Sequence, residues 1–249
     1  MIDALAPKAI SDEYCAAYGA YDNSGLLLDT GADVRAMVCS LDLSEGAISL
    51  AREKDANLIL THHPAIYGKL SSLLTAHPAE KKLIACAKGD VSIVSMHLNL
   101  DCVEGGIDDS LVEAFGGITL SVMERLKQGG YGKLSKVKPQ PLRAFVRSLN
   151  ETLETERTVV YGEREVSLVA SFCGAGVSEE ALSFAKEQNA DTVLSSDWKH
   201  HLIVLCREYG MNAVSVTHYA SESYGFRKFV NKCQATLPVP CFLHEDGWK

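Results

Sequence analysis

Short apolar segments of strand type alternate with segments of helix type along the chain, and this alternation limits the folds that are open to it. In the first half, strands are expected at 34–41, 58–61 and 91–96, with helices at 6–17, 42–54, 79–88 and 110–115. A strand, a helix and a second strand in this order form a βαβ unit, in which the two strands are parallel. The sequence therefore predicts an α/β protein.

The second half repeats the alternation without clear residue identity to the first. Strands are expected at 132–137, 157–161, 166–173, 192–195 and 213–217, with helices from Pro139 or Pro141 to about Leu153, at 178–188 and at 198–209. The glycine-rich run 129–132 is the candidate boundary. We therefore expect two similar α/β domains, residues 1–125 and 126–249.

Composition narrows the class of partner. The formal net charge of −8 disfavours nucleic acid and anionic membranes as partners. No apolar stretch approaches the roughly 20 residues of a membrane helix. The eight cysteines are scattered without a Cys-x-x-Cys pair, which favours reduced thiols. We expect a soluble cytoplasmic protein whose partners are small molecules or proteins.

Adjacent histidines follow one of the apolar strands. The strand 58–61 runs directly into His62 and His63, which are followed by Pro64. The crevice at the carboxyl ends of such strands is where open α/β proteins usually bind their ligands. Neighbouring side chains on an extended backbone point to opposite faces. Two neighbouring ions, one per histidine, therefore fit this pair more easily than a single shared ion.

The next strand ends in a second group of ligand-type residues. His97 follows the strand 91–96, and Asp101 lies four residues farther along. The spacing suits a loop around an ion, although Asp101 is also placed to cap a helix beginning near Val103. Because the two strands are expected to be parallel, His97 and Asp101 should lie at the same edge as His62 and His63.

A third group follows the last strand of the second half. His218 and Glu222 are four residues apart, so they share one face of a helix that begins near His218. Ordinary helix capping by Ser221 and Glu222 is the alternative reading. Imidazole and carboxylate ligands without thiolate suit zinc, manganese, iron, cobalt or nickel. Two-metal sites of this composition serve hydrolysis.

Five segments taken together resemble the successive motifs of the Nif-three-like family, whose bacterial members are also called YbgI-like or GTP cyclohydrolase 1 type 2 proteins. The similarity runs from about residue 20 to residue 230 in family order. The segments are Tyr21-Asp22-Asn23-Ser24-Gly25-Leu26, Thr61-His62-His63-Pro64, His97-Leu98-Asn99-Leu100-Asp101 with Gly105-Gly106, Asp197-Trp198-Lys199-His200-His201, and His218-Tyr219-Ala220-Ser221-Glu222. The chain departs from the usual family pattern at Leu98, Asp197 and Thr217, none of which is an expected ligand.

The resemblance implies a dinuclear metal site in the cleft between two similar α/β domains of the Nif-three-like fold, and a homohexamer. By position, His63 and Asp101 hold one divalent ion, His62 and His218 hold the other, and Glu222 bridges the two. The first domain then carries His62, His63, His97 and Asp101, and the second carries His201, His218 and Glu222. His97 and His201 become the expected catalytic or substrate-contacting residues.

The leading hypothesis for function is a dinuclear metal-dependent hydrolase. A water that bridges the ions would attack GTP or another nucleotide, with His97 or His201 moving protons. Hydrolytic opening of the purine ring is suggested by the family name alone. The alternative hypothesis is a metal-binding protein that buffers ions or delivers them to other enzymes, since it would use the same ligands.

Overall fold

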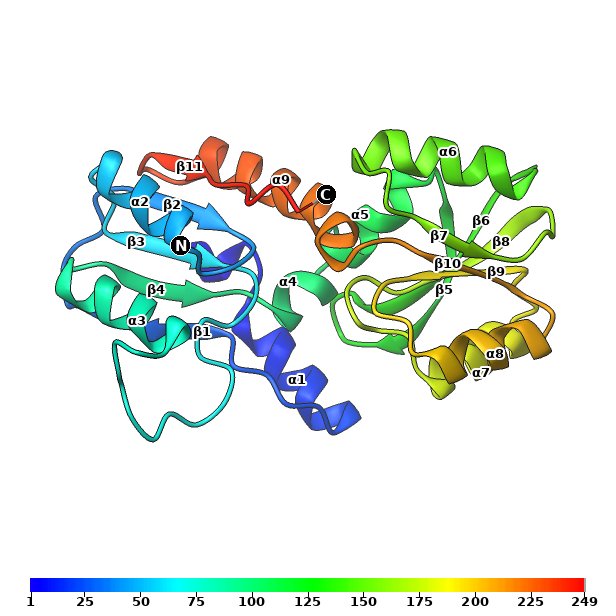
Figure 1. Cartoon of the computed structure of the whole chain (residues 1–249), viewed down its shortest axis with the longest axis horizontal. Helices are drawn as coiled ribbons and strands as arrows, with labels where there is room; N and C mark the ends of the chain where they lie inside the picture. Colours follow the sequence, from blue (N-terminus) through cyan, green and yellow to red (C-terminus); the bar gives the residue numbers. More distant parts are fainter. Residues whose placement is uncertain (249) are drawn as a thin grey trace. The chain divides into compact units, whose positions relative to one another are not determined.

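The computed structural model describes residues 1–248 and divides them into two units, each built on one β-sheet with helices (Figure 1). The first unit contains residues 1–100 and 226–247, and the second contains residues 101–225 with Trp248. The predicted α/β class and the presence of two α/β units are confirmed. Two helices run across the division, α4 (Leu98–Cys102) and α9 (His218–Thr236).

The first sheet has five strands in the order β1-β4-β3-β2-β11. The strands are β1 (Gly25–Leu28), β2 (Met37–Ser40), β3 (Leu58–Thr61), β4 (Ser92–Ser95) and β11 (Cys241–Leu243). β4, β3, β2 and β11 are parallel, and β1 is antiparallel to β4. The predicted βαβ unit is therefore present, and its carboxyl strand ends meet at one edge.

Helices α2 (Glu45–Glu53) and α3 (Pro78–Lys88) cover one face of this sheet. Ser44 caps α2 by accepting a hydrogen bond from the Ala47 amide, as the Ser in this position predicts. The apolar side of each helix packs on alternate residues of the three central strands, Val38, Ile59 and Ile93. The unit also contains a short 3₁₀-helix η1 (Ile2–Ala4) and α1 (Lys8–Tyr18).

The second sheet has six strands in the order β5-β6-β8-β9-β10-β7. The strands are β5 (Ile118–Arg125), β6 (Gly130–Gln140), β7 (Val159–Tyr161), β8 (Val166–Ser171), β9 (Thr192–Ser195) and β10 (Asn212–Ser215). β8, β9 and β10 are parallel, and the other neighbouring pairs are antiparallel. Helix α6 (Leu142–Leu153) lies on one side, and α7 (Glu179–Glu187) and α8 (His200–Glu208) lie on the other (Figure 1).

Helix α6 is strongly amphipathic and shows how the second core forms. Its buried residues Leu142, Phe145, Leu149 and Leu153 recur at helical spacing. The ring of Phe145 packs against Phe115, which follows α5 (Ile107–Ala114), with centroids 5.7 Å apart. The packing of α6 on Phe115 holds α5 in place. Because α5 begins shortly after Asp101, this packing also limits the position of Asp101.

The glycine-rich candidate boundary is a hairpin. Residues 126–129 connect β5 to β6, and Gly129 and Gly130 have φ of +85° and +138°. A Cβ at Gly130 would lie 2.3 Å from the Glu124 carbonyl oxygen. The turn therefore requires glycine for local geometry. The division of the chain differs from the expected boundary after residue 125, because residues 101–125 group with the second unit and residues 226–247 return to the first.

Strands β1 and β11 were not predicted from the sequence. β1 begins at Gly25, the last residue of the segment 21–25, whose sequence is typical of a turn. β11 is only three residues long. Each is an edge strand whose partner decides its conformation.

The longest helix, α9, carries charged side chains along its length, and within residues 1–248 no helix is both long enough and apolar enough to cross a membrane.

Candidate metal centre

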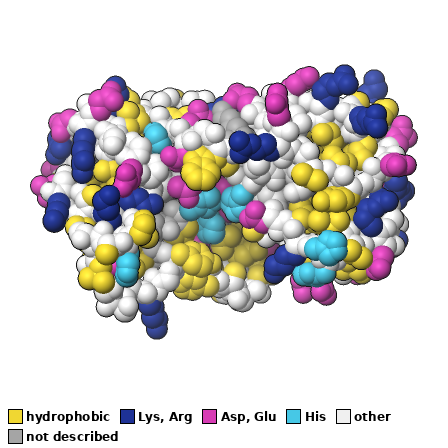
Figure 2. Space-filling view, in the orientation of Figure 1, with side chains coloured by type: hydrophobic (Ala, Val, Ile, Leu, Met, Phe, Trp, Pro, Cys, Tyr) yellow, Lys and Arg dark blue, Asp and Glu magenta, His cyan; other side chains and the backbone are white. Residues whose placement is uncertain are grey.

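Three histidines of the first unit gather where two parallel strands end. His62 and His63 follow β3, and His97 follows β4. The ring centroids of His62 lie 4.9 Å from those of His63 and 5.2 Å from those of His97, and His63 and His97 are 6.0 Å apart. The expectation that these residues meet at one sheet edge is confirmed. Figure 2 shows histidine side chains gathered on one face of the molecule, with acidic and hydrophobic side chains beside them.

His62 and His63 are each held by one ring nitrogen. Nδ1 of His62, which is fully buried, lies 2.8 Å from the Met96 carbonyl oxygen. Nδ1 of His63 lies 2.9 Å from Oδ1 of Asp42. A carbonyl or carboxylate oxygen only accepts, so Nδ1 of each ring carries the proton. The lone pair of each neutral ring is then on Nε2, the nitrogen that a metal ion can bind.

His97 is oriented in the same way by Asp22. Its Nδ1 lies 2.8 Å from Oδ1 of Asp22, and its backbone amide donates to Ser24 Oγ. The other oxygen of Asp22 accepts from the hydroxyls of Ser11 and Ser24. Burial raises the pKa of Asp22, but the hydrogen bonds from His97, Ser11 and Ser24 outweigh burial and hold the pKa well below its usual range. Asp22 is therefore a fixed negative charge behind the ring.

The first turn of α9 carries an imidazole and a carboxylate. Nδ1 of His218 lies 2.6 Å from Oδ2 of Asp197, and Nε2 lies 3.0 Å from Oε1 of Glu222. The predicted sharing of one helix face by His218 and Glu222 is confirmed. With the proton on Nδ1, the Nε2 lone pair faces a carboxylate oxygen, and two acceptors at this distance require a proton or a metal ion between them. Glu222 is buried, which increases this requirement.

The alternative of helix capping by Ser221 is not observed at this helix start. Thr217 Oγ1 accepts from the Ala220 amide, and Ser221 Oγ accepts from the Gly174 amide. Thr217 is therefore the residue that caps α9.

Asp101 lies on α4, one helical turn after His97. It is buried, and the Cys173 thiol lies 3.5 Å from its Oδ1. The alternative in which Asp101 caps a helix near Val103 is not observed, because the next helix begins at Ile107 after Gly106.

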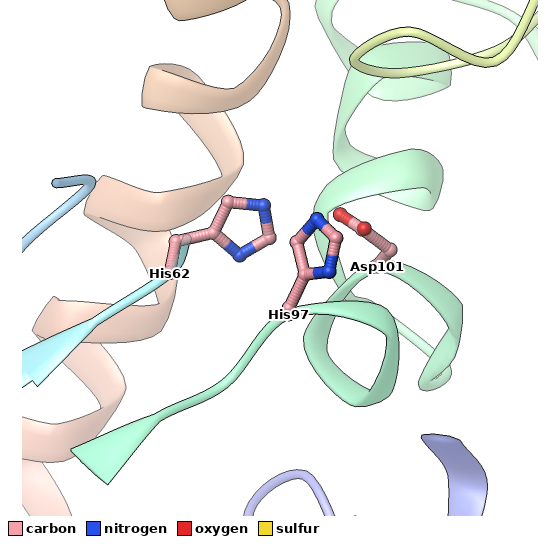
Figure 3. Close-up of side chains that lie close together, drawn as sticks. All are labelled: His62, His97 and Asp101. Atoms are coloured by element: carbon pink, nitrogen blue, oxygen red, sulfur yellow. The ribbon is translucent and has the colours of Figure 1, made fainter. Parts of the chain in front are cut away.

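Two groups of donor side chains among residues 1–248 could each hold a metal ion. The first is His62 with His97 and Asp101, whose donor atoms lie within 4.8 Å of one another (Figure 3). The second is His62 with His63 and Glu222. The chain therefore has a candidate metal centre of imidazole and carboxylate ligands.

His201 is exposed on the first turn of α8. Its expected part in catalysis stays a prediction.

The sequence did not predict that Asp22, Asp42 and Asp197 orient the histidines. Asp42 reads as a helix cap and Asp22 as part of a turn, while Asp197 stands out only in a family motif. For Asp42 and Asp197, the distance from the preceding strand could have indicated this role. Asp42 and Asp197 each lie two residues beyond the end of a strand, β2 and β9. His63 and His97 occupy the same position after β3 and β4.

An exposed aromatic pair lies close in sequence to the histidine cluster. The rings of Tyr21 and Tyr67 meet edge to face with centroids 5.4 Å apart, and both side chains are more than half exposed. Tyr21 precedes Asp22, and Tyr67 lies four residues after His63. The Asn23 side chain donates to the Ile66 carbonyl and ties the two loops together.

Two α/β units with imidazoles and carboxylates at their strand ends define an α/β protein with a candidate metal centre. Residues 9–244 match the family model described as Duf34/NIF3 (NGG1p interacting factor 3). The chain belongs to the Duf34/NIF3 family, as its motifs predict.

Individual relatives agree over most of the chain. It is 29% identical over 209 residues to a GTP cyclohydrolase 1 type 2 homolog of Clostridium perfringens, covering 81% of this chain and 79% of the relative. It is 28% identical over 249 residues to the protein of the same name from Methanocaldococcus jannaschii, covering 96% and 93%. The crystal structure of a Bacillus cereus protein related to NIF3 has the same fold, with a TM-score of 0.84, 18% identity and coverage of 100% and 95%.

Proposed function

We propose that the chain binds two divalent metal ions. In this proposal His63 and Asp101 hold one ion, His62 and His218 hold the other, and Glu222 bridges them. The observation that carries it is the fixing of His62, His63 and His218 by acceptors at Nδ1, which leaves Nε2 of each ring as the nitrogen for a metal ion. The close approach of His218 Nε2 to Glu222 supports the bridging role.

The donor set fits a first-row divalent ion such as zinc, iron, manganese, cobalt or nickel. Bound ions would supply Lewis-acid activation of water and of the electrophile. The chain's own residues would orient the substrate and move protons.

His97 is proposed to move protons at Nε2. Asp22 holds the ring by Nδ1 and stabilises the protonated imidazole, which is the arrangement that suits a general base or acid. His97 also belongs to a possible ligand group with His62 and Asp101. If a His97→Ala protein lost bound metal, His97 would be a metal ligand and not a proton-transfer residue. We propose a second proton-transfer or substrate-contacting part for His201.

The proposed reaction is hydrolysis of a nucleotide, with GTP as the first substrate to test. The relatives' name, GTP cyclohydrolase 1 type 2 homolog, is the reason for choosing GTP. The exposed rings of Tyr21 and Tyr67 offer planar surfaces on which a purine could stack. We further propose that the protein is a homohexamer and that it is located in the cytoplasm. Sedimentation velocity would measure the number of subunits.

The deciding experiment compares wild type with Glu222→Ala and with Glu179→Ala, an exposed glutamate at the start of α7. Elemental analysis of the purified proteins should give about two ions per chain for wild type and Glu179→Ala, and fewer for Glu222→Ala. Equal metal in all three proteins would contradict the metal centre.

Turnover of nucleoside triphosphates and phosphoesters is then measured on the loaded proteins. Metal without turnover across the panel would favour the alternative of a protein that buffers or delivers ions.

A further inference from the structure

The last residues of three neighbouring parallel strands form a row of buried hydroxyl side chains. Ser40 ends β2, Thr61 ends β3 and Ser95 ends β4, and the strand register places Thr61 between the two serines. All three residues are fully buried. A hydroxyl without access to water depends on protein groups for its hydrogen bonds. The row lies directly before His62 and two residues before His97, so its hydrogen bonds bear on the histidine cluster.

Two hydroxyls of the row belong to a hydrogen-bond chain in which every direction is fixed. Thr61 Oγ1 lies 2.8 Å from the His63 carbonyl oxygen, which only accepts, so the Thr61 hydroxyl donates to it. Because this uses its single proton, the Ser95 hydroxyl, which lies 2.6 Å away, must donate to Thr61 Oγ1. Ser95 Oγ in turn accepts from the Ala65 amide at 3.2 Å. The chain therefore leads from Ala65 through two hydroxyls back to His63.

The hydrogen-bond chain closes the bend that follows β3. His62 and His63 are neighbours in sequence, and on an extended backbone their side chains would point to opposite faces. The backbone instead bends at both residues, and their ring centroids are 4.9 Å apart. The Thr61 hydroxyl spans this bend, and Ser95 fastens it to β4, the strand that leads to His97. The two strand ends are thus joined behind the rings.

We propose that Thr61 and Ser95 are positioning residues of the metal centre, whose hydroxyls hold the bend that lets His62 and His63 serve neighbouring ions. Neither residue is among the proposed ligands, since both hydroxyls are used within the hydrogen-bond chain. The inference rests on the proposed function, because it requires bound metal. Loss of either hydroxyl frees the bend and weakens the ion held by His63 more than it weakens the fold.

Thr61→Val removes the hydroxyl and keeps the shape of the side chain, whereas Thr61→Ser keeps the hydroxyl. In a titration of the zinc-loaded proteins with a chelator, Thr61→Val should release one of its two ions with an affinity about 10–100-fold below that of wild type. Thr61→Ser should restore the affinity to within about threefold of wild type. The matched control is Ser40→Ala, because Ser40 is equally buried in the same row and its hydroxyl has no hydrogen-bond partner among residues 1–248.

The visible absorption of the cobalt-loaded proteins separates positioning from a general loss of stability. The absorption bands of Co²⁺ respond to the geometry of its ligands. They should change in Thr61→Val and remain as in wild type in Thr61→Ser and Ser40→Ala, at a temperature where circular dichroism shows all the proteins to be folded. Ser95→Ala cuts the link to β4, should change the spectrum in the same way, and carries the test if Thr61→Val does not fold.

Three results would overturn the positioning role and leave the metal centre standing. The first is wild-type zinc affinity with an unchanged cobalt spectrum in both Thr61→Val and Ser95→Ala. The second is an equal loss of affinity in Ser40→Ala, which has no part in the hydrogen-bond chain. The third is a Thr61→Ser protein that binds zinc as weakly as Thr61→Val. A wild-type protein that binds no metal would instead overturn both this inference and the proposed function.

Discussion

Nδ1 of His97 lies 2.8 Å from Oδ1 of Asp22, a residue 75 positions earlier in the chain. The aspartate is itself fixed by two hydroxyl donors, Ser11 and Ser24. A carboxylate held in this way keeps the proton on Nδ1 of the ring and the lone pair on Nε2. The two residues therefore act as a unit in any chemistry at this sheet edge.

Asp22→Asn should lower kcat/KM of the metal-loaded protein by about 10–100-fold, the usual effect of losing a residue that orients a metal-site histidine. The amide keeps the shape of the side chain but not the charge. Steady-state kinetics with elemental analysis measure the effect, and Asp12→Asn on the exposed side of α1 is the control. Full activity and full metal content in Asp22→Asn would show that the charge is dispensable.

Gly174→Ala should reduce metal binding through a direct clash. A Cβ at Gly174 would lie 2.6 Å from Glu222 Oε1 and 3.4 Å from His218 Nε2. Its φ of +55° also strains an alanine, at a cost of about 1–2 kcal/mol. Gly116→Ala separates the two effects, because Gly116 has a φ of +69° and open space around its Cβ position.

Both variants should therefore show a lower Tm, while only Gly174→Ala should lose at least half of its bound metal. Equal metal content in the two variants would contradict a place for Glu222 and His218 among the ligands.

Tyr67→Ala should raise KM for nucleoside triphosphates about tenfold and leave kcat within about twofold. Loss of base stacking costs about 1–3 kcal/mol, and the cost falls on binding. The control is Leu73→Ala, an equally exposed apolar residue of the same connection between β3 and α3. Inorganic triphosphate, which has no base, should be processed equally by both variants. An unchanged nucleotide KM in Tyr67→Ala would remove the aromatic pair from the site.

Asp108 gives the second unit a stability that depends on pH. Burial, followed by the charges of Asp101 and Asp109, raises its pKa to about 7, although Lys133 and the Cys173 amide act in the opposite direction. The folded state then holds a proton that the unfolded state releases near pH 4. Stability from this group is present below pH 4 and is lost as pH rises through about 7, by up to about 4 kcal/mol.

Asp108→Asn should remove this loss. The free energy of unfolding of wild type minus that of the variant should fall between pH 4 and pH 8. Urea unfolding followed by tryptophan fluorescence reports on this unit, because Trp198 and Trp248 both belong to it. Asp90→Asn is the control, at an exposed position with φ of +52° that asparagine tolerates. A constant difference across this pH range would contradict the buried, protonated Asp108.

Much of the framework could be predicted because its signals lie within short windows of sequence. The strand 58–61 and the strand 192–195 have the predicted bounds, and Ser44 and Ser178 cap the helices that precede these strands. A run of apolar residues or a helix cap is encoded within a few positions. The placement of His62 and His63 after a strand, and the four-residue spacing of His218 and Glu222, are local signals of the same kind.

Other features depend on residues far apart in the chain. Asp42 contacts His63 and Asp197 contacts His218 across 21 positions each, and Asp22 contacts His97 across 75. The glycines at 129–130 resemble a linker in sequence but form a hairpin, and residues 241–243 return to pair with β2. The sequence by itself determined the alternation of elements and the ligand types at the strand ends, since these follow from local periodicity. Only the tertiary structure decided which carboxylate orients which imidazole, because that choice depends on how distant segments pack.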